Sequence, residues 1–267
     1  MNPHERMGRA CGPRLSGDVR DGMHDGAEGK AGAYAGHGSH GLTLSEGERG
    51  MDAQFWIKVW TEGRTAFHQD KVNEKLMDYF PRLNPSPGQK VLVPLCGKSK
   101  DLLWLLGLKL RVHGVELHGQ AVESFYAENG LSPVEKSVGP DFTRYAQGDL
   151  VVSCGDFFKF EEAAAYDFVY DRAALVALPA PMRKAYAKVA AGALKSGGQC
   201  LLIVYDYDQQ KMEGPPFSVG ENEIRELYGE AFDIQVLESQ DVGKEGPRFA
   251  ALGGIRQNCY SLKKRGG

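Results

Sequence analysis

The amino-acid sequence predicts an α/β fold in which a mostly parallel sheet carries helices on both faces. Short apolar runs rich in β-branched residues alternate with segments of helical periodicity, the pattern of buried strands joined by helices. The first unit lies at residues 90–106, where Pro94 and Gly97 break a β-branched run before apolar residues return at helical density. We therefore expect a strand, a sharp turn and a helix, with Ser99 as the N-cap and Asp101 in the first helical turn, where the helix dipole favours an acid.

The second predicted strand, at residues 111–117, ends in a carboxylate. Glu116 follows the glycine turn by roughly 20 residues, the spacing at which an acid can accept both hydroxyls of a ribose. The turn contains one glycine, Gly97, so the dinucleotide pattern G-x-G-x-x-G is absent, and Leu92 stands where a phosphate-binding loop would need its first glycine. A nucleoside without a polyphosphate fits better. S-adenosyl-L-methionine is the common one, with its amino-acid moiety at the turn and its ribose on Glu116.

The remaining elements follow the same alternation. Residues 51–80 show helical spacing interrupted by a loop at 63–67, and residues 131–148 are polar and predict a connection with a short hairpin. Further strands are expected at 150–154, 166–170, 199–205, 234–238 and 258–262, and further helices at 119–129, 182–194 and 221–228. The last two strands are short and terminal, which suits an antiparallel hairpin that closes the sheet.

Six motifs between Met51 and Lys264 resemble the thiopurine S-methyltransferase family in its bacterial form, in order and with similar spacing. They are Phe55-Trp56 with Trp60, TAFHQ at 65–69, PLCGK at 94–98, GVEL at 114–117, DRAALVA at 171–177 and GPPF at 214–217. The resemblance implies a Rossmann-like methyltransferase sheet of seven strands, mostly parallel with the last strand antiparallel. It also implies methyl transfer from S-adenosyl-L-methionine to the sulfur of aromatic or heterocyclic thiols, with S-adenosyl-L-homocysteine as the product and without a metal.

The resemblance also assigns residues to the site. Those implied to bind the cofactor are Trp60, Leu95, Gly97, Glu116, Asp156, Phe157 and Arg172, and those implied to bind the substrate are Phe67, Pro216 and Phe217. Trp60 and Phe67 would form an aromatic lid, which suits both a sulfonium and a flat heterocycle. Asp156 and Phe157 follow the third strand of the parallel sheet, where such methyltransferases meet the adenine amino group. Arg172 follows the next strand and would position the thiolate.

Structural roles remain open for several of these residues. Asp156 can cap a turn, Arg172 can form a surface ion pair with Asp171, and residues 214–217 can be a plain connection over the sheet edge. His68 can act as a base or can fix its own loop by a hydrogen bond. The sequence alone does not decide between these roles and the ones that the family implies.

Methyl transfer from a sulfonium requires alignment of the reacting atoms in a dry pocket more than it requires a strong base. Aromatic and heterocyclic thiols ionise near neutral pH, and a nearby guanidinium such as Arg172 favours the anion. The same chemistry extends to selenols and soft inorganic anions, so a selenium, tellurium or halide methyltransferase of the same fold is an alternative. A non-catalytic protein that binds the cofactor is a second alternative, and the joint presence of Trp60, Phe67, Glu116 and Arg172 argues against it.

Composition limits the partners and the location of the chain. Of its 267 residues, 42% are hydrophobic and 25% are charged, which suffices for one sizeable core. A formal charge of -3 and a pI of about 6.2 disfavour nucleic acid, and no apolar run has the length of a membrane span. Five cysteines without C-x-x-C spacing argue against disulfides and zinc and favour the cytoplasm. We expect a monomer that acts on a small molecule.

The first 50 residues differ from the rest of the chain. They are rich in glycine and poor in large apolar residues, so they cannot bury enough surface to offset their ordering entropy. The resemblance begins at Met51, and residues 46–50 are what the purine-rich codons of a ribosome-binding site would encode. We therefore expect a disordered extension at 1–50, a natural start at Met51 and a methyltransferase domain with an N-terminal helical lid at 51–267.

Overall fold

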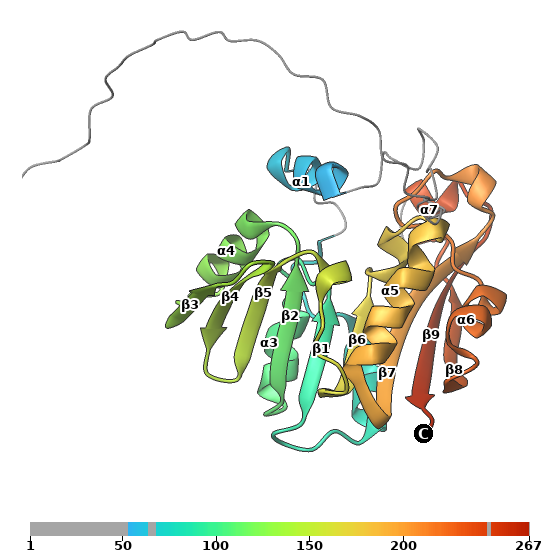
Figure 1. Cartoon of the computed structure of the whole chain (residues 1–267). Helices are drawn as coiled ribbons and strands as arrows, with labels where there is room; N and C mark the ends of the chain where they lie inside the picture. The colour runs from blue at the N-terminus through green and yellow to red at the C-terminus, as the bar shows by residue number, and fades with distance from the viewer. Residues whose placement is uncertain (1–52, 64–67, 245–246, 267) are drawn as a thin grey trace, which may run out of the picture. The chain divides into compact units, whose positions relative to one another are not determined.

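A nine-stranded sheet organises the described part of the computed structural model, which comprises residues 53–63, 68–244 and 247–266 (Figure 1). The strands are β1 (Lys90–Pro94), β2 (Arg111–Glu116), β3 (Glu135–Val138), β4 (Phe142–Gln147), β5 (Leu150–Gly155), β6 (Tyr166–Arg172), β7 (Leu194–Tyr207), β8 (Phe232–Asp241) and β9 (Ile255–Lys264). Their order across the sheet is β3-β4-β5-β2-β1-β6-β7-β9-β8. The predicted disorder of residues 1–50 and the predicted role of Phe67 fall outside the described residues.

The centre of the sheet is parallel, as the sequence predicts. Neighbouring strands in the series β5-β2-β1-β6-β7 pair in parallel, whereas β9 runs antiparallel to both of its neighbours, β7 and β8. The α/β class and the antiparallel pairing of the last two strands are thereby confirmed. The five parallel strands end on one side of the sheet, here called the carboxyl edge, at Pro94, Glu116, Gly155, Arg172 and Tyr207. Open α/β sheets bind their ligands at this edge.

The predicted count of seven strands is wrong, because residues 131–148 do more than connect two elements. β4 pairs antiparallel with β5 along its whole length and β3 pairs with β4, so this hairpin extends the sheet by two strands. All four residues of β3 are exposed, and the strand therefore lacks the apolar alternation that would reveal it in the sequence. Backbone pairing, rather than side-chain burial, makes these residues part of the sheet.

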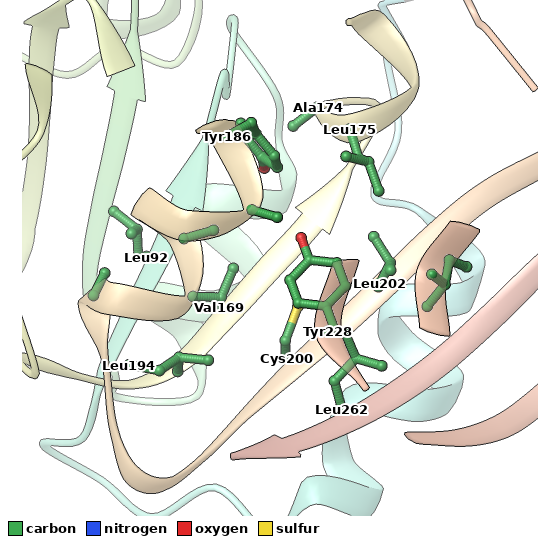
Figure 2. Close-up of a cluster of buried hydrophobic side chains, with 14 of the residues drawn as sticks. Leu92, Val169, Ala174, Leu175, Tyr186, Leu194, Cys200, Leu202, Tyr228 and Leu262 are labelled. Atoms are coloured by element: carbon green, nitrogen blue, oxygen red, sulfur yellow. The ribbon is translucent and has the colours of Figure 1, made fainter. Parts of the chain in front are cut away.

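Helices cover both faces of the sheet. The helices of the described residues are α1 (Ala53–Thr61), α2 (Glu74–Tyr79), α3 (Asp101–Gly107), α4 (Gly119–Glu128), α5 (Ala180–Ala193), α6 (Glu221–Tyr228) and α7 (Pro247–Ala250), of which α1 lies beyond the carboxyl ends of the strands (Figure 1). One buried cluster lies between the sheet and α5 with α6 and includes Tyr186 and Leu92 (Figure 2). A second cluster, which includes Leu102 of α3, contains Val91 and Val93, so alternate side chains of β1 belong to opposite faces. Among the described helices, none combines the length and the apolar character that a membrane crossing requires.

Asp101, at the start of α3, ties together segments that are distant in sequence. Its side chain is buried and accepts hydrogen bonds from the backbone N–H of Asn73 (2.8 Å) and from the hydroxyl of Tyr170 in β6 (3.0 Å). Ser99 Oγ accepts the backbone N–H of Asp101 (3.2 Å), although the helix itself begins one residue later than a Ser99 N-cap would place it. The acid therefore does more than favour the helix dipole, because it fixes the chain before α2 to the end of β6.

Candidate functional site

The turn that follows β1 has an unusual backbone. Leu95 and Gly97 have positive φ angles of 48° and 54°, and the former is a conformation that a residue with a side chain adopts at a cost. The buried thiol of Cys96 packs against β2, where a Cβ on Gly114 would lie 2.7 Å from its Sγ atom. Backbone strain of this kind is concentrated at ligand sites. The predicted cofactor residues Leu95 and Gly97 thus lie in one strained turn at the carboxyl edge.

Glu116, the last residue of β2, joins this turn to the next one. Its carboxylate is buried, with Oε2 accepting the backbone N–H of Gly97 and Oε1 accepting the backbone N–H of His118, both at 2.8 Å. Burial raises the pKa of Glu116, and these backbone donors oppose that rise. A carboxylate offers about four acceptor positions, so about two remain for a ligand. The structure thus joins the glycine turn to the strand-ending acid by a direct hydrogen bond, and the predicted binding of ribose by Glu116 stays a prediction.

Trp60 of α1 lies over both turns. A Cβ on Gly97 would come within 3.1 Å of the Trp60 ring, a tight contact, and the φ of 54° itself favours glycine at this position. The ring is also nearly parallel to that of His118, with an interplanar angle of 10° and centroids 6.3 Å apart. The structure therefore brings Trp60, Gly97 and Glu116 together. It adds His118, which the sequence analysis missed although the residue stands only two positions after the strand-ending acid.

Arg172 ends β6 at the same edge. It is partly exposed, and within the described ranges its guanidinium forms no hydrogen bond or ion pair. The predicted alternative, an ion pair with Asp171, is wrong, because Asp171 is buried and accepts hydrogen bonds from the Tyr186 hydroxyl (2.8 Å) and the backbone N–H of Leu175 (3.1 Å). Burial raises the pKa of Asp171 to about 6. The neighbouring Ala173 has a φ of 63°, which makes this a second strained turn at the carboxyl edge.

His68 lies near this group of residues. Its side chain is 12% exposed, and its Nε2 atom is 3.4 Å from Oδ1 of Asp70. Burial lowers the pKa of His68, and the positive charges of Lys98 and Arg172 lower it further, so that the ring is neutral at pH 7. This arrangement is compatible with either predicted role, a base or an anchor of its own loop.

Asp156 and Phe157 follow β5. Oδ1 of Asp156 accepts the backbone N–H of Phe158 (2.9 Å) and so caps a short 3₁₀ turn, the structural role that the sequence analysis left open. The ring of Phe157 is buried among core aromatic rings, with Phe160 stacked at 5.9 Å and Tyr186 at 5.2 Å. Contact of this pair with an adenine ring stays a prediction, in which Asp156 and the backbone of Phe157 carry the interaction.

The segment Gly214 to Phe217 is fixed to the rest of the fold. The carbonyl oxygen of Pro216 accepts the Tyr207 hydroxyl (2.6 Å), and the backbone N–H of Phe217 donates to the carbonyl of Val176 (2.7 Å). The Phe217 ring lies against Gly214, where a Cβ would come within 2.6 Å of it. These bonds tie the segment to the end of β7 and to the chain after Arg172. A substrate wall formed by Pro216 and Phe217 stays a prediction.

The residues of the carboxyl edge fit a nucleoside. The buried carboxylate of Glu116 retains acceptor positions for hydrogen bonds. Gly97 has no side chain to block the approach of a ligand to the turn, and the Trp60 indole lies over both residues. In the part of the chain that the structure describes, no group of three or more His, Cys, Asp or Glu side chains is placed to hold a metal ion. Chemically, this arrangement can hold a hydroxylated, uncharged ring system beside the guanidinium of Arg172, which has no partner among the described residues.

Comparisons with known proteins agree with this arrangement. The family model for thiopurine S-methyltransferase matches residues 51–265. Thiopurine S-methyltransferase of Bordetella parapertussis is 47% identical over 220 residues, which cover 81% of this chain and 100% of that protein.

Solved structures share the fold at low sequence identity. The Burkholderia thailandensis 1,6-didemethyltoxoflavin-N1-methyltransferase, with bound 1,6-didemethyltoxoflavin and S-adenosylhomocysteine, has a TM-score of 0.58 at 15% identity, covering 85% of this chain and 93% of that one. The Haemonchus contortus phosphoethanolamine N-methyltransferase 2 in complex with S-adenosyl-L-methionine has a TM-score of 0.54 at 15% identity, covering 83% and 60%. The sheet with its covering helices is therefore that of the S-adenosylmethionine-dependent methyltransferases.

Proposed function

Because this chain belongs to the thiopurine S-methyltransferase family, we propose that it transfers a methyl group from S-adenosyl-L-methionine to the sulfur of an aromatic or heterocyclic thiol, which it binds as the thiolate. The observation that carries the proposal is the guanidinium of Arg172. It lies at the carboxyl edge, without a hydrogen bond or ion pair among the described residues, on the strand next to β1, whose following turn would hold the cofactor.

Glu116, Gly97 and Trp60 would hold the cofactor. When bound, S-adenosyl-L-methionine supplies an electrophilic methyl group on a sulfonium. Glu116 would accept the ribose hydroxyls with the acceptor positions that its two backbone hydrogen bonds leave over. The indole of Trp60 would cover the site and exclude water, and its electron-rich face suits a neighbouring positive charge.

Arg172 would select the acceptor by charge. A guanidinium stays protonated throughout the physiological pH range and lowers the pKa of a nearby thiol, so that a larger share is thiolate. Proton removal then needs no dedicated base, because the thiol loses its proton to solvent before it reacts. His68, which is neutral at pH 7, could take up that proton instead. Pro216 and Phe217 would form the wall against which the flat ring of the acceptor lies.

A methyl-transfer assay with labelled S-adenosyl-L-methionine tests the proposal. The panel comprises thiophenol, 6-mercaptopurine, selenite, tellurite and iodide, and the binding of S-adenosylhomocysteine is measured separately by calorimetry. Turnover of the thiols supports the proposal. Turnover of selenite, tellurite or iodide without any thiol would overturn it in favour of a metalloid or halide acceptor, since Arg172 attracts any soft anion. Binding of S-adenosylhomocysteine without turnover of any acceptor would favour a non-catalytic protein.

A further inference from the structure

His118, in the turn after β2, carries a ring nitrogen whose hydrogen-bonding capacity the fold leaves unused. Its Nδ1 atom is buried and has no hydrogen-bond partner among the residues that the structure describes. Buried polar atoms are almost always paired, and one that is not costs stability, so the exception needs a cause. The position of the residue supplies one, because its backbone N–H is held by Glu116 Oε1 at 2.8 Å and its ring lies beside that of Trp60.

The chemistry of the neighbouring carboxylate indicates what this nitrogen is for. Glu116 can only accept hydrogen bonds, because it already accepts two backbone N–H groups as a carboxylate. A ribose hydroxyl that donates to Glu116 still has an oxygen that accepts, and it needs a donor. Burial lowers the pKa of His118, so the ring is neutral at pH 7 and one of its two nitrogens carries a hydrogen. In the tautomer that carries this hydrogen on Nδ1, the ring is a donor in the turn that already presents the acceptor.

We propose that His118 is a further cofactor-binding residue, whose Nδ1–H donates to a ribose hydroxyl of the adenosyl group while Glu116 accepts the hydrogen of the same hydroxyl. The inference rests on the proposed function, because it requires an adenosyl ligand at the carboxyl edge. It goes beyond that function because it assigns a hydrogen-bond donor to the ribose, for which the sequence and the family resemblance supply only an acceptor, Glu116.

Two substitutions separate the nitrogen from the ring. His118→Phe keeps a flat ring beside Trp60 and removes Nδ1, whereas His118→Asn removes the ring and places a side-chain amide where Nδ1 was. Dissociation constants of the full chain are measured by calorimetry for S-adenosylhomocysteine and for its 2′-deoxy and 3′-deoxy analogues. Urea denaturation of each variant checks that it is folded, and we expect His118→Phe to be at least as stable as the wild type because it removes an unpaired buried nitrogen.

The expected result is a loss of about five- to tenfold in S-adenosylhomocysteine affinity for His118→Phe, and recovery to within about twofold for His118→Asn. With the deoxy analogue that lacks the contacted hydroxyl, wild type and His118→Phe should bind equally. Unchanged affinity in His118→Phe, or an equal loss for all three ligands, would overturn the inference and leave the proposed function standing. Failure of the wild type itself to bind S-adenosylhomocysteine would overturn the proposed function and this inference with it.

Discussion

Strand β2 carries one histidine inside the sheet and leads into another just beyond its carboxyl end, and the two are bonded very differently. His113 uses both ring nitrogens: Nδ1 is hydrogen-bonded to the Tyr166 hydroxyl and Nε2 to Ser153 Oγ at 2.8 Å. The Tyr166 hydroxyl donates its one hydrogen to Glu162 (2.7 Å), so it accepts from Nδ1–H, and Nε2 in turn accepts from Ser153. His118 leaves Nδ1 unpaired.

The same contrast holds beyond the two histidines. At the carboxyl edge the guanidinium of Arg172 has no partner among the described side chains. Around His113, by contrast, every ring and hydroxyl group just named is paired. Unused hydrogen-bonding capacity is a cost that a fold retains where a ligand offsets it. Side chains whose hydrogen-bonding groups are all paired should therefore contribute to the stability of the fold. Side chains with unused hydrogen-bonding groups should contribute to ligand binding.

The largest expected effect is on a fully paired group. His113→Leu leaves Tyr166 Oη and Ser153 Oγ without their buried partner, and we expect the free energy of unfolding to fall by about 2–4 kcal/mol. The affinity for S-adenosylhomocysteine should stay within about twofold of the wild type, because the residue lies inside the sheet. Urea denaturation and calorimetry measure the two quantities. A change in affinity as large as the change in stability would contradict the division proposed here.

Glu116→Ala tests the other side of the comparison. The carboxylate would form charged hydrogen bonds with the ribose, so its removal should weaken S-adenosylhomocysteine binding by about 1.5–3 kcal/mol, or about 10- to 150-fold. Glu128→Ala is the matched control, since Glu128 binds Lys98 of the same turn through a half-exposed carboxylate (2.7 Å). The affinity of Glu128→Ala for S-adenosylhomocysteine should stay within about twofold of the wild-type value. An unchanged dissociation constant in Glu116→Ala would remove this residue from the site.

Arg172→Met should have a smaller effect that depends on pH. Loss of the guanidinium raises the pKa of the bound thiol, so kcat for an aromatic thiol should fall about tenfold below that pKa and recover at alkaline pH, where the bound thiol is ionised in both proteins. Arg144→Met provides the control, because Arg144 is a half-exposed guanidinium paired with Glu162 (3.5 Å), away from the carboxyl edge. A loss of kcat that is equal at every pH would show that Arg172 does not promote ionisation of the bound thiol.

The sequence predicts the parts of this molecule that local pattern determines. The helix expected at 221–228 is α6 with the same bounds, and the second strand ends in the carboxylate of Glu116 nearly as expected. Hydrogen bonds between distant residues leave no such pattern. Asp101 is 28 residues from Asn73 and 69 from Tyr170, and its position at a helix start predicts only a dipole interaction.

Edge strands and unpaired atoms are equally hidden in the sequence. β3 joins the sheet through backbone bonds with all its side chains exposed, so it has no hydrophobic period. The unused Nδ1 of His118 is a property of its surroundings, since His113, only five positions earlier, has the same side chain and no free nitrogen. A histidine two positions after a strand-ending acid is nevertheless a feature that sequence inspection can note.

The smallest effect in the wild type is the combined contribution of two buried groups, His113 and Asp171, to the change of stability with pH, because the two oppose one another. Burial lowers the pKa of His113 from 6.5 to about 4, so the unfolded chain binds more protons there and stability is lost as the pH falls from 6.5 to 4. Burial raises the pKa of Asp171 from 3.8 to about 6, so its contribution is fully present below 3.8 and is lost as the pH rises to 6. Each contribution amounts to about 3 kcal/mol, so their sum changes by less than about 1 kcal/mol over this range.

Two variants break that balance in opposite directions. Asp171→Asn removes the group that gains stability in acid, so between pH 6.5 and 4 its free energy of unfolding should fall by about 3 kcal/mol relative to the wild type. His113→Leu removes the group whose contribution to stability is lost in acid. Between pH 6.5 and 4 the free energy of unfolding of this variant should therefore rise by a similar amount relative to the wild type. Other titrating groups are common to all three proteins and cancel in the differences. Urea denaturation at pH 7, 6, 5 and 4 measures the three curves, and parallel curves would show that neither buried group couples folding to pH.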